Sequence, residues 1–455
     1  MNSKFCRIIL CAALACAAST HQGRAQTPNI PPPPPANAKD VAKSVPLWTE
    51  AERQAVVTYW SAPGRYKIEP AADIGSRVNI TVPGSLWWAA LNQAMTQQTK
   101  ETAAAWLAWA TARLTRERGE VDDRLANATA PPPTEATGTP ADIKAAVGEP
   151  PALYESTKPQ RYTVAFASGD ATLPFVYVDN IDFTRRKPYM PAYRSTNGVV
   201  QYGKRVKDYT GEEQKARETL FVSVGGTESQ RRVLQAVSAL EGGFEAVNTY
   251  DTGWVSIGFI QFITARNGDG SLAAVLARHK ADDPADFAQT FHRFGIDVLP
   301  DTILAVVDPQ TGQEKRGSEA VQTVINDKRL TAVFERAGSR DGFRRAQIRV
   351  ARERYWPGDD LVSVMPNGNS NAPAPPAPLV CKASDIVKSE AGMATLMDRK
   401  VNRGNIRLIN QVAADLMRRY NLTRLEDLAE HERELVSAMK YRHDFLSDST
   451  LSQPK

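Results

Sequence analysis

Apolar residues recur at three- and four-residue steps between positions 227 and 241, which predicts an amphipathic helix. The apolar stripe consists of Val233, Leu234, Val237 and Leu240. Thr227 and Gln230 have the spacing of a capping box, which satisfies free N–H groups in the first turn of a helix. We therefore expect the helix to begin near Thr227 and to end near Glu241, because Gly242 and Gly243 follow directly.

The positions after this glycine pair have the pattern of strands. Residues 244–250 alternate loosely between polar and apolar side chains, and residues 254–262 form a β-prone run. Between them, Asp251, Thr252 and Gly253 are a turn signal. The pattern predicts a β-hairpin that follows the helix, with Asp251 at its turn.

Two carboxyl groups in this segment suggest acid–base chemistry. Glu241 lies at the edge of the apolar stripe, where loss of solvation raises a carboxyl pKa and keeps a proton available for a general acid. Asp251, at the predicted turn, is expected to stay solvated and ionised. Glycoside cleavage uses such a pair, and the distance between the two carboxyls decides between inversion and retention. Glu245 is a weaker candidate for the second carboxylate.

A Glu that closes a helix, an Asp in a hairpin and a hydroxyl residue two positions before a glycine, as in WVSIGFIQF, resemble the lysozyme-like superfamily. The resemblance implies Glu241 as the acid, Asp251 as the second carboxylate and Ser256 as the hydroxyl that positions water. Asn248, Tyr250, Gly258 and Gln261 are the implied substrate-binding residues. The chain departs from the phage-type pattern by one more residue between Glu and Asp and one fewer between Asp and the hydroxyl.

A second point of resemblance is the run MDRKVNRGNI at positions 397–406, which is similar to a helix end in muramidase-type members of the superfamily. The hairpin is also similar to those of bacterial chitosanases and of secreted muramidases. The resemblance is specific for residues 241–262, extends to the predicted helices at 318–356 and 384–441, and is absent before about position 201.

Composition changes along the chain and predicts its organisation. The predicted parts are a signal peptide at 1–25, a Pro-rich linker at 26–45, a helical accessory region at 46–128, a second linker at 129–152, a β-containing segment at 153–212 and a catalytic domain at 213–455 with a low-complexity insertion at 366–378. Six of the eight tryptophans fall in the accessory region, where core packing is a better explanation than sugar stacking.

The remaining chemistry of the chain narrows the possible functions. The five histidines show no metal-ligand spacing, and neither a GxSxG motif nor a phosphate-binding loop is present. Cys381 is the one cysteine outside the signal segment, so an intramolecular disulfide is not expected. The basic run at 340–356 has interleaved apolar residues and predicts an amphipathic helix instead of a nucleic-acid site. The apolar run at 8–18 is shorter than the roughly 20 residues that a membrane-spanning helix needs.

Together these features predict an α+β protein, mainly helical and lysozyme-like, with a small β-hairpin wing and a preceding helical accessory region. The expected function is a secreted glycoside hydrolase that cleaves the glycan strands of peptidoglycan, located in the periplasm or outside the cell. Its expected partner is peptidoglycan or a related amino-sugar polysaccharide, without nucleic acid, metal or cofactor. The alternatives are a chitosanase, a lytic transglycosylase and a non-catalytic wall-binding protein. A net charge of +5 agrees weakly with an anionic polymer as partner.

Overall fold

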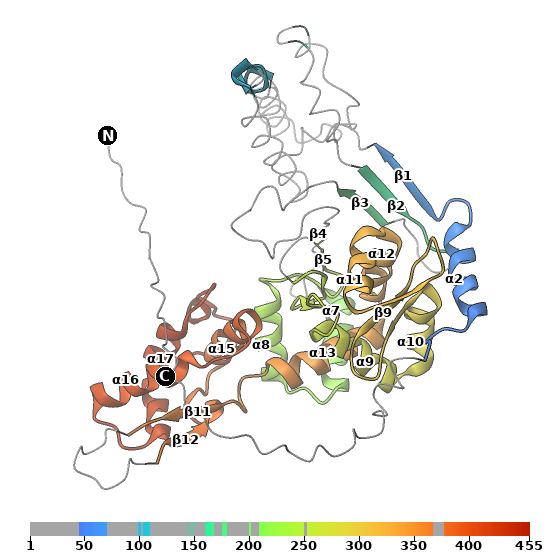
Figure 1. The fold of residues 1–455 in the computed structure, drawn as a ribbon. Helices are drawn as coiled ribbons and strands as arrows, with labels where there is room; N and C mark the ends of the chain where they lie inside the picture. Colours follow the sequence, from blue (N-terminus) through green and yellow to red (C-terminus); the bar gives the residue numbers. More distant parts are fainter. Residues whose placement is uncertain are drawn as a thin grey trace, which may run out of the picture. The chain divides into compact units, whose positions relative to one another are not determined.

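A computed structural model describes residues 45–70, 99–101, 103–109, 145, 148, 160–167, 175–179, 200–201, 209–249, 253–366 and 377–455. Residues Val45–Lys455 form one compact unit. The described part is α+β and mostly helical, with small antiparallel sheets, as the sequence predicted (Figure 1). The predicted signal peptide, the first linker up to residue 44 and most of the second linker lie outside the described residues.

The α-helices are α2 (Glu50–Ser61), α7 (Gly211–Ser223), α8 (Glu228–Ser238), α9 (Ser271–Asp282), α10 (Pro284–Thr290), α11 (Gly317–Asn326), α12 (Lys328–Ala337), α13 (Asp341–Tyr355), α14 (Ala383–Ile386), α15 (Glu390–Arg403), α16 (Leu408–Tyr420) and α17 (Glu432–Met439). Short 3-10 helices are η3 (His292–Phe294), η4 (Leu425–His431) and η5 (Phe445–Ser447). In the described part, no helix has both the length and the apolar character to cross a bilayer.

In the described part of the chain, the strands form four small sheets. The first contains β1 (Tyr66–Pro70), β2 (Gln160–Val164) and β3 (Phe175–Asp179), and the second contains β4 (Val200–Gln201), β5 (Val247–Asn248), β6 (Ser256–Ile257) and β7 (Phe262–Ile263). The third contains β8 (Ile296–Val298), β9 (Leu304–Val307) and β10 (Glu314–Arg316), and the fourth is the hairpin of β11 (Leu361–Val364) and β12 (Leu379–Lys382).

Helix α8 begins where the sequence predicted. Thr227 is its N-cap, and both hydrogen bonds of the capping box with Gln230 are present. Val233, Leu234 and Val237 are fully buried, because the apolar stripe faces the core. The helix ends at Ser238, three residues before the predicted end, and the chain continues as a turn in which the Glu241 N–H donates to the Ser238 carbonyl over 3.0 Å.

The predicted hairpin is present but shorter than expected. Strand β5 pairs with β6 in the register Val247 to Ile257 and Asn248 to Ser256. Residues 258–261 form a turn, so the predicted strand at 254–262 is divided between β6 and β7. The break follows from the backbone, since Gly258 and Gln261 both have positive φ angles that a strand does not accommodate.

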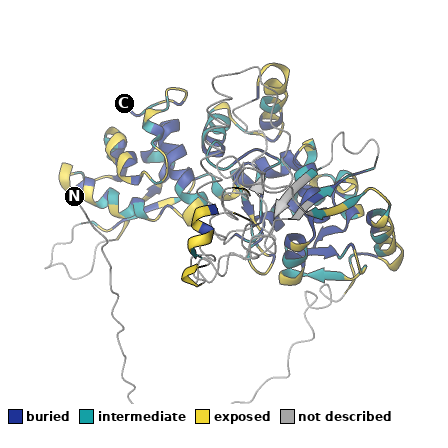
Figure 2. Cartoon of the chain, turned by 90° about the horizontal axis from the view of Figure 1, so that it is seen from above, coloured by how far each residue is buried: buried dark blue, intermediate teal, exposed yellow. Residues whose placement is uncertain are grey.

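The helices pack with one buried side and one exposed side (Figure 2). Helix α15 packs against α8 and α17, and α16 packs against α17 and β11. Helix α13 packs against α9 and α7. The basic run at 340–356 forms α13, whose Phe343, Ile348 and Ala351 are fully buried, so the predicted amphipathic helix is confirmed.

The segment at 45–70 belongs to the same compact unit as residues 213–455. Trp48 and Trp60 are buried, and their indole N–H groups donate to the carbonyls of His292 and Phe294. Trp106 and Trp109 are also buried, which confirms core packing for the four described tryptophans of this region. Strand β1 pairs with β2, so the predicted accessory region and the predicted β-containing segment share one sheet.

Candidate functional site

A pocket of about 410 Å³ lies at the C-terminal end of α8. Its lining residues are Leu240, Glu241, Asn248, Gly253, Ser256, Ile260, Gln261, Ile263, Val401 and Asn402. Three parts of the chain supply them: the turn after α8, the sheet of β5 to β7, and α15. The lining combines one carboxyl group, three side-chain amides and a hydroxyl with apolar residues. Such a mixture suits an uncharged polar ligand.

Glu241 is held at the edge of this pocket with little exposure. Its side chain is 12% exposed, and one carboxyl oxygen accepts a hydrogen bond from Arg442 Nη2 at 2.5 Å. Burial raises the pKa of Glu241 above its ordinary value, and the charge of Asp398 adds to the rise. The Arg442 guanidinium and a hydrogen bond from Asn402 lower that pKa, but burial has the larger effect. The raised pKa that the sequence predicted from the apolar stripe is therefore present.

Arg442 pairs with a second carboxyl group besides that of Glu241. Its Nε and Nη2 also donate to Asp398 Oδ1, at 2.9 and 2.5 Å. Asp398 is 1% exposed, whereas the Arg442 side chain is 31% exposed. A carboxyl group this deeply buried is stabilised by a paired cation, so Arg442 compensates Asp398 as well as Glu241. Glu241 has a raised pKa next to a guanidinium because the effect of burial outweighs that of Arg442.

Helix α15 brings part of the run at 397–406, the second point of resemblance, next to Glu241. Asp398, Val401 and Asn402 are spaced at three and four residues, so they lie on one face of the helix. Val401 and Asn402 line the pocket, and the Asn402 amide donates to the carbonyl and the carboxylate of Asp398 at 2.8 and 3.2 Å. The sequence singled out this run, but its proximity to Glu241 is a property of the fold.

The hairpin supplies the opposite wall. Asn248 and Ser256 are paired across β5 and β6, and both line the pocket. Ser256 is 2% exposed. Gln261 has a φ of 55°, and its side-chain amide donates to the Gly258 carbonyl at 3.1 Å, which holds it at the turn. The structure thus brings Glu241 together with Asn248, Ser256 and Gln261, which lie 7 to 20 positions after it in the sequence.

Gly258 does not line the pocket. It has a structural role, because the hairpin requires a glycine where Gln347 approaches the backbone. Its φ is 85°, and a Cβ there would lie 2.1 Å from Oε1 of Gln347. The Gln347 amide in turn donates to the Phe244 carbonyl, and its oxygen accepts from the Phe259 N–H. A glycine is required at 258 because α13 approaches the hairpin so closely.

Two of the predicted site residues, Tyr250 and Asp251, lie outside the described residues. Glu245, the weaker candidate for the second carboxylate, is paired with Arg344 at 2.7 Å and does not line the pocket. Arg442 was missed by sequence reasoning, since a single arginine 201 positions after Glu241 carries no local signal. Asp398 lies in the run at 397–406, which the sequence singled out, although no role was predicted for it.

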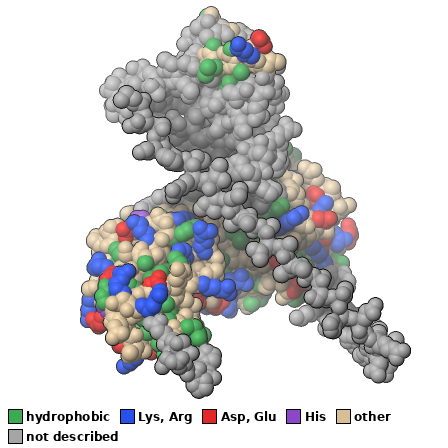
Figure 3. Space-filling model, turned by 60° about the vertical axis from the view of Figure 1, so that its left-hand side comes forward, with side chains coloured by type: hydrophobic (Ala, Val, Ile, Leu, Met, Phe, Trp, Pro, Cys, Tyr) green, Lys and Arg blue, Asp and Glu red, His purple; other side chains and the backbone are tan. Residues whose placement is uncertain are grey.

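No family model matches the chain, and no curated protein or solved structure matches it either. Among the described residues, no group of three His, Cys, Asp or Glu side chains is placed to bind a metal ion. On the face shown in Figure 3, Lys and Arg side chains are interspersed with acidic and uncharged ones. The geometry and chemistry around Glu241 are therefore the basis for inferring a function.

Proposed function

We propose that the protein is an exported glycoside hydrolase that cleaves the glycan strands of bacterial peptidoglycan, with Glu241 as the general acid. The observation that carries the proposal is a mostly buried carboxyl group of raised pKa that opens into a pocket of amide and hydroxyl side chains. A carboxyl group of this kind can hold a proton close to neutral pH and donate it to a glycosidic oxygen.

In the proposed reaction, the Glu241 proton passes to the glycosidic oxygen as the bond between that oxygen and the anomeric carbon breaks. The sugar develops oxocarbenium character, and Glu241 becomes ionised. Arg442, at 2.5 Å, then stabilises the carboxylate that proton transfer leaves behind. Asn402 acts in the same sense, since it also lowers the pKa of Glu241. These two residues lower the free energy of the ionised product state, while burial keeps the proton on Glu241 beforehand.

The second half of the reaction decides the product. With Asp251 and Ser256 activating water, the anomeric carbon receives a hydroxyl group, and attack from the opposite face inverts its configuration. Among the described lining residues, Glu241 is the one carboxyl group, and this observation favours a second candidate. A lytic transglycosylase needs a single acid, because the C6 hydroxyl of the sugar closes an anhydro ring in place of water. The mass of the product distinguishes the two, since hydrolysis adds one water.

The pocket chemistry favours peptidoglycan over chitosan as substrate. Asn248, Gln261 and Asn402 offer side-chain amides that can both donate to and accept from the hydroxyl and acetamido groups of a glycan. Chitosan is a polycation and requires several acidic groups, whereas the described lining has one. A chitosanase and a non-catalytic wall-binding protein are therefore alternative outcomes of the test.

The test is release of reducing ends by the purified protein from peptidoglycan and from chitosan, with product masses measured. Glu241→Gln keeps the shape and removes the acid, and Glu212→Gln on the exposed face of α7 is the matched control. Release from peptidoglycan that Glu241→Gln abolishes and Glu212→Gln preserves supports the proposal. Anhydro products reassign it to a transglycosylase, and release from chitosan alone reassigns the substrate. Binding to the wall without release of products favours the binding protein and overturns the proposal.

A further inference from the structure

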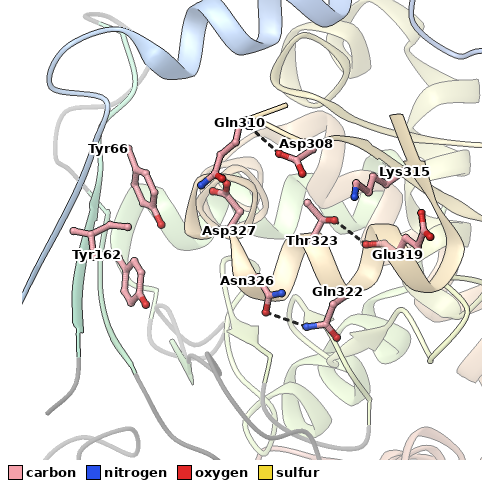
Figure 4. Close-up of a pocket in the computed structure, with 11 residues that line it drawn as sticks. Tyr66, Tyr162, Asp308, Gln310, Lys315, Glu319, Gln322, Thr323, Asn326 and Asp327 are labelled. Atoms are coloured by element: carbon pink, nitrogen blue, oxygen red, sulfur yellow. Dashed lines mark hydrogen bonds between the residues drawn. The ribbon is translucent and has the colours of Figure 1, made fainter. Parts of the chain in front are cut away.

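A second pocket, of about 480 Å³, shares no residue with the pocket of Glu241 (Figure 4). Tyr66, Ile68 and Tyr162, from β1 and β2, form one wall. The opposite wall comes from α11 and from the connection between β9 and β10. We call it the tyrosine pocket. It brings together parts of the chain that the sequence predicted as separate regions.

The two tyrosines form a fixed pair. They lie on the same face of neighbouring antiparallel strands, with ring centroids 6.4 Å apart and planes inclined by 21°. The Arg329 guanidinium lies 4.8 Å from the Tyr66 ring, and the Lys328 ammonium lies 5.4 Å from the Tyr162 ring. Both cations are buried, so they hold the rings from within the protein. Burial raises the pKa of Tyr66, so its hydroxyl keeps a proton that it can donate.

The helix wall is rich in uncharged polar groups. Gln322 and Asn326 lie one turn apart on α11, and the Gln322 amide donates to Asn326 Oδ1 at 2.9 Å. The Asn326 side chain is exposed and lines the pocket. Gln310 places a third amide on the rim, from the turn between β9 and β10. These amides can donate and accept at once, as sugar hydroxyl groups do.

The charges around the tyrosine pocket compensate one another. Asp327 is paired with Arg329 at 2.6 Å, and Asp308 accepts the backbone N–H groups of Gln310 and Thr311 at 2.8 and 3.2 Å. The Lys315 ammonium and the Glu319 carboxylate, one charge of each sign, complete the ionic lining. The lining itself carries three carboxyl groups, on Asp308, Glu319 and Asp327, and one ammonium, on Lys315. The buried cations Arg329 and Lys328, beside the two tyrosine rings, balance the excess negative charge. With the charge balanced in this way, the pocket does not select a polyanion or a polycation.

We propose that the tyrosine pocket binds an uncharged segment of a glycan, with hydroxyl or acetamido groups facing the amides and apolar faces against Ile68 and the tyrosine edges. The volume is within the range of small-molecule sites, which is about 300 to 1,000 Å³. A second binding site for the polymer raises the effective concentration of glycan near the protein surface. Binding here does not require that Glu241 is catalytic, so the two proposals can fail independently.

The experiment is a calorimetric titration of the full protein with a tetramer of N-acetylglucosamine, in a Glu241→Gln background that prevents turnover. Gln322→Ala/Asn326→Ala removes two amides from the tyrosine pocket, and Gln289→Ala/Gln411→Ala removes two exposed amides elsewhere. Because each lost hydrogen bond weakens binding several-fold, we expect the first pair to weaken one glycan-binding event about tenfold or more. The control pair should leave it unchanged, and circular dichroism should show that both double variants are folded.

The outcomes separate the two proposals. If the Glu241 pocket also binds glycan, the tetramer shows two binding events, and the amide variant loses one of them. If only the tyrosine pocket binds glycan, a single event disappears with Gln322→Ala/Asn326→Ala, and the proposed function fails while this inference stands. Binding that Gln322→Ala/Asn326→Ala and Tyr66→Phe both leave unchanged overturns the inference. Absence of any tetramer binding, or binding of a muropeptide stem in place of the tetramer, also overturns it.

Discussion

The two pockets differ in how their charges are compensated, and this difference suits the Glu241 pocket to the proposed acid chemistry and the tyrosine pocket to the proposed recognition of a neutral ligand. In the Glu241 pocket, burial raises the pKa of Glu241, and Arg442, which also pairs with Asp398, lowers that pKa only in part. In the tyrosine pocket, Asp327 has its own partner in Arg329, and uncharged amides dominate the rim. A proton donor requires a carboxyl group whose charged form is penalised, whereas recognition of a neutral ligand requires charges that are already satisfied.

The largest expected effect is the loss of the acid. Glu241→Gln should lower kcat on peptidoglycan by roughly 10²- to 10⁴-fold, the usual contribution of general acid–base catalysis. KM should change little, because the amide keeps the size of the carboxyl group. Steady-state kinetics of Glu241→Gln, with Glu212→Gln as the control, measure kcat and KM. A kcat within a factor of a few of the native value would show that Glu241 is not the general acid. The affinity for glycan at the tyrosine pocket should be unaffected by the substitution.

A substitution at Gly258 should disrupt the hairpin wall of the Glu241 pocket and leave the tyrosine pocket intact. Gly258→Ala places a methyl group against Gln347 and keeps a positive φ that alanine tolerates poorly. We expect a loss of about 2 to 3 kcal/mol in the free energy of unfolding, from strain and overpacking. Urea denaturation measures the loss. Gly404→Ala, where φ is 74° and the space is open, is the matched control and should cost only about 1 kcal/mol.

Removing the shared cation should change both stability and pH dependence. Arg442→Gln leaves Asp398 buried without its ion pair, which should cost on the order of 2 kcal/mol, less than for a fully buried pair because Arg442 is partly exposed. Arg442 lowers the pKa of Glu241, so its loss should move the basic limb of the pH–rate profile to higher pH. The profile of kcat/KM from pH 4 to 9 tests this. A limb that stays in place or moves to lower pH contradicts the shared pairing.

The smallest effect is the pH dependence of stability. The folded-state pKa of Glu241 is raised, so the native protein binds this proton more tightly than the unfolded chain. The carboxyl group therefore destabilises the fold as the pH rises from the unfolded pKa toward the folded one. Relative to the native protein, Glu241→Gln should gain stability over that interval and keep a constant advantage above it. Thermal unfolding at pH 3, 5 and 7 measures the trend, and an advantage that shrinks with rising pH would be inconsistent with a buried acid.

Sequence reasoning located the local parts of the candidate site. The capping box at Thr227, the buried stripe of α8 and the hairpin that follows are encoded within a few residues of each other, and all three are present. The amphipathic character of α13 was also readable from its interleaved apolar residues. The exact strand lengths could not be read from the sequence. They depend on the turn at 258–261, where Gln347 of α13 approaches Gly258 closely.

The sequence by itself determined where Glu241 would lie relative to its helix and hairpin, since periodicity and turn residues act over short distances. Only the tertiary structure decided that Arg442 and Asp398 would share their charges beside Glu241, and that β1, β2 and α11 would form the tyrosine pocket. The physical reason is that a pKa and a binding surface depend on groups that are close in space. Residues as far apart as Glu241 and Arg442 meet only after the helices have packed.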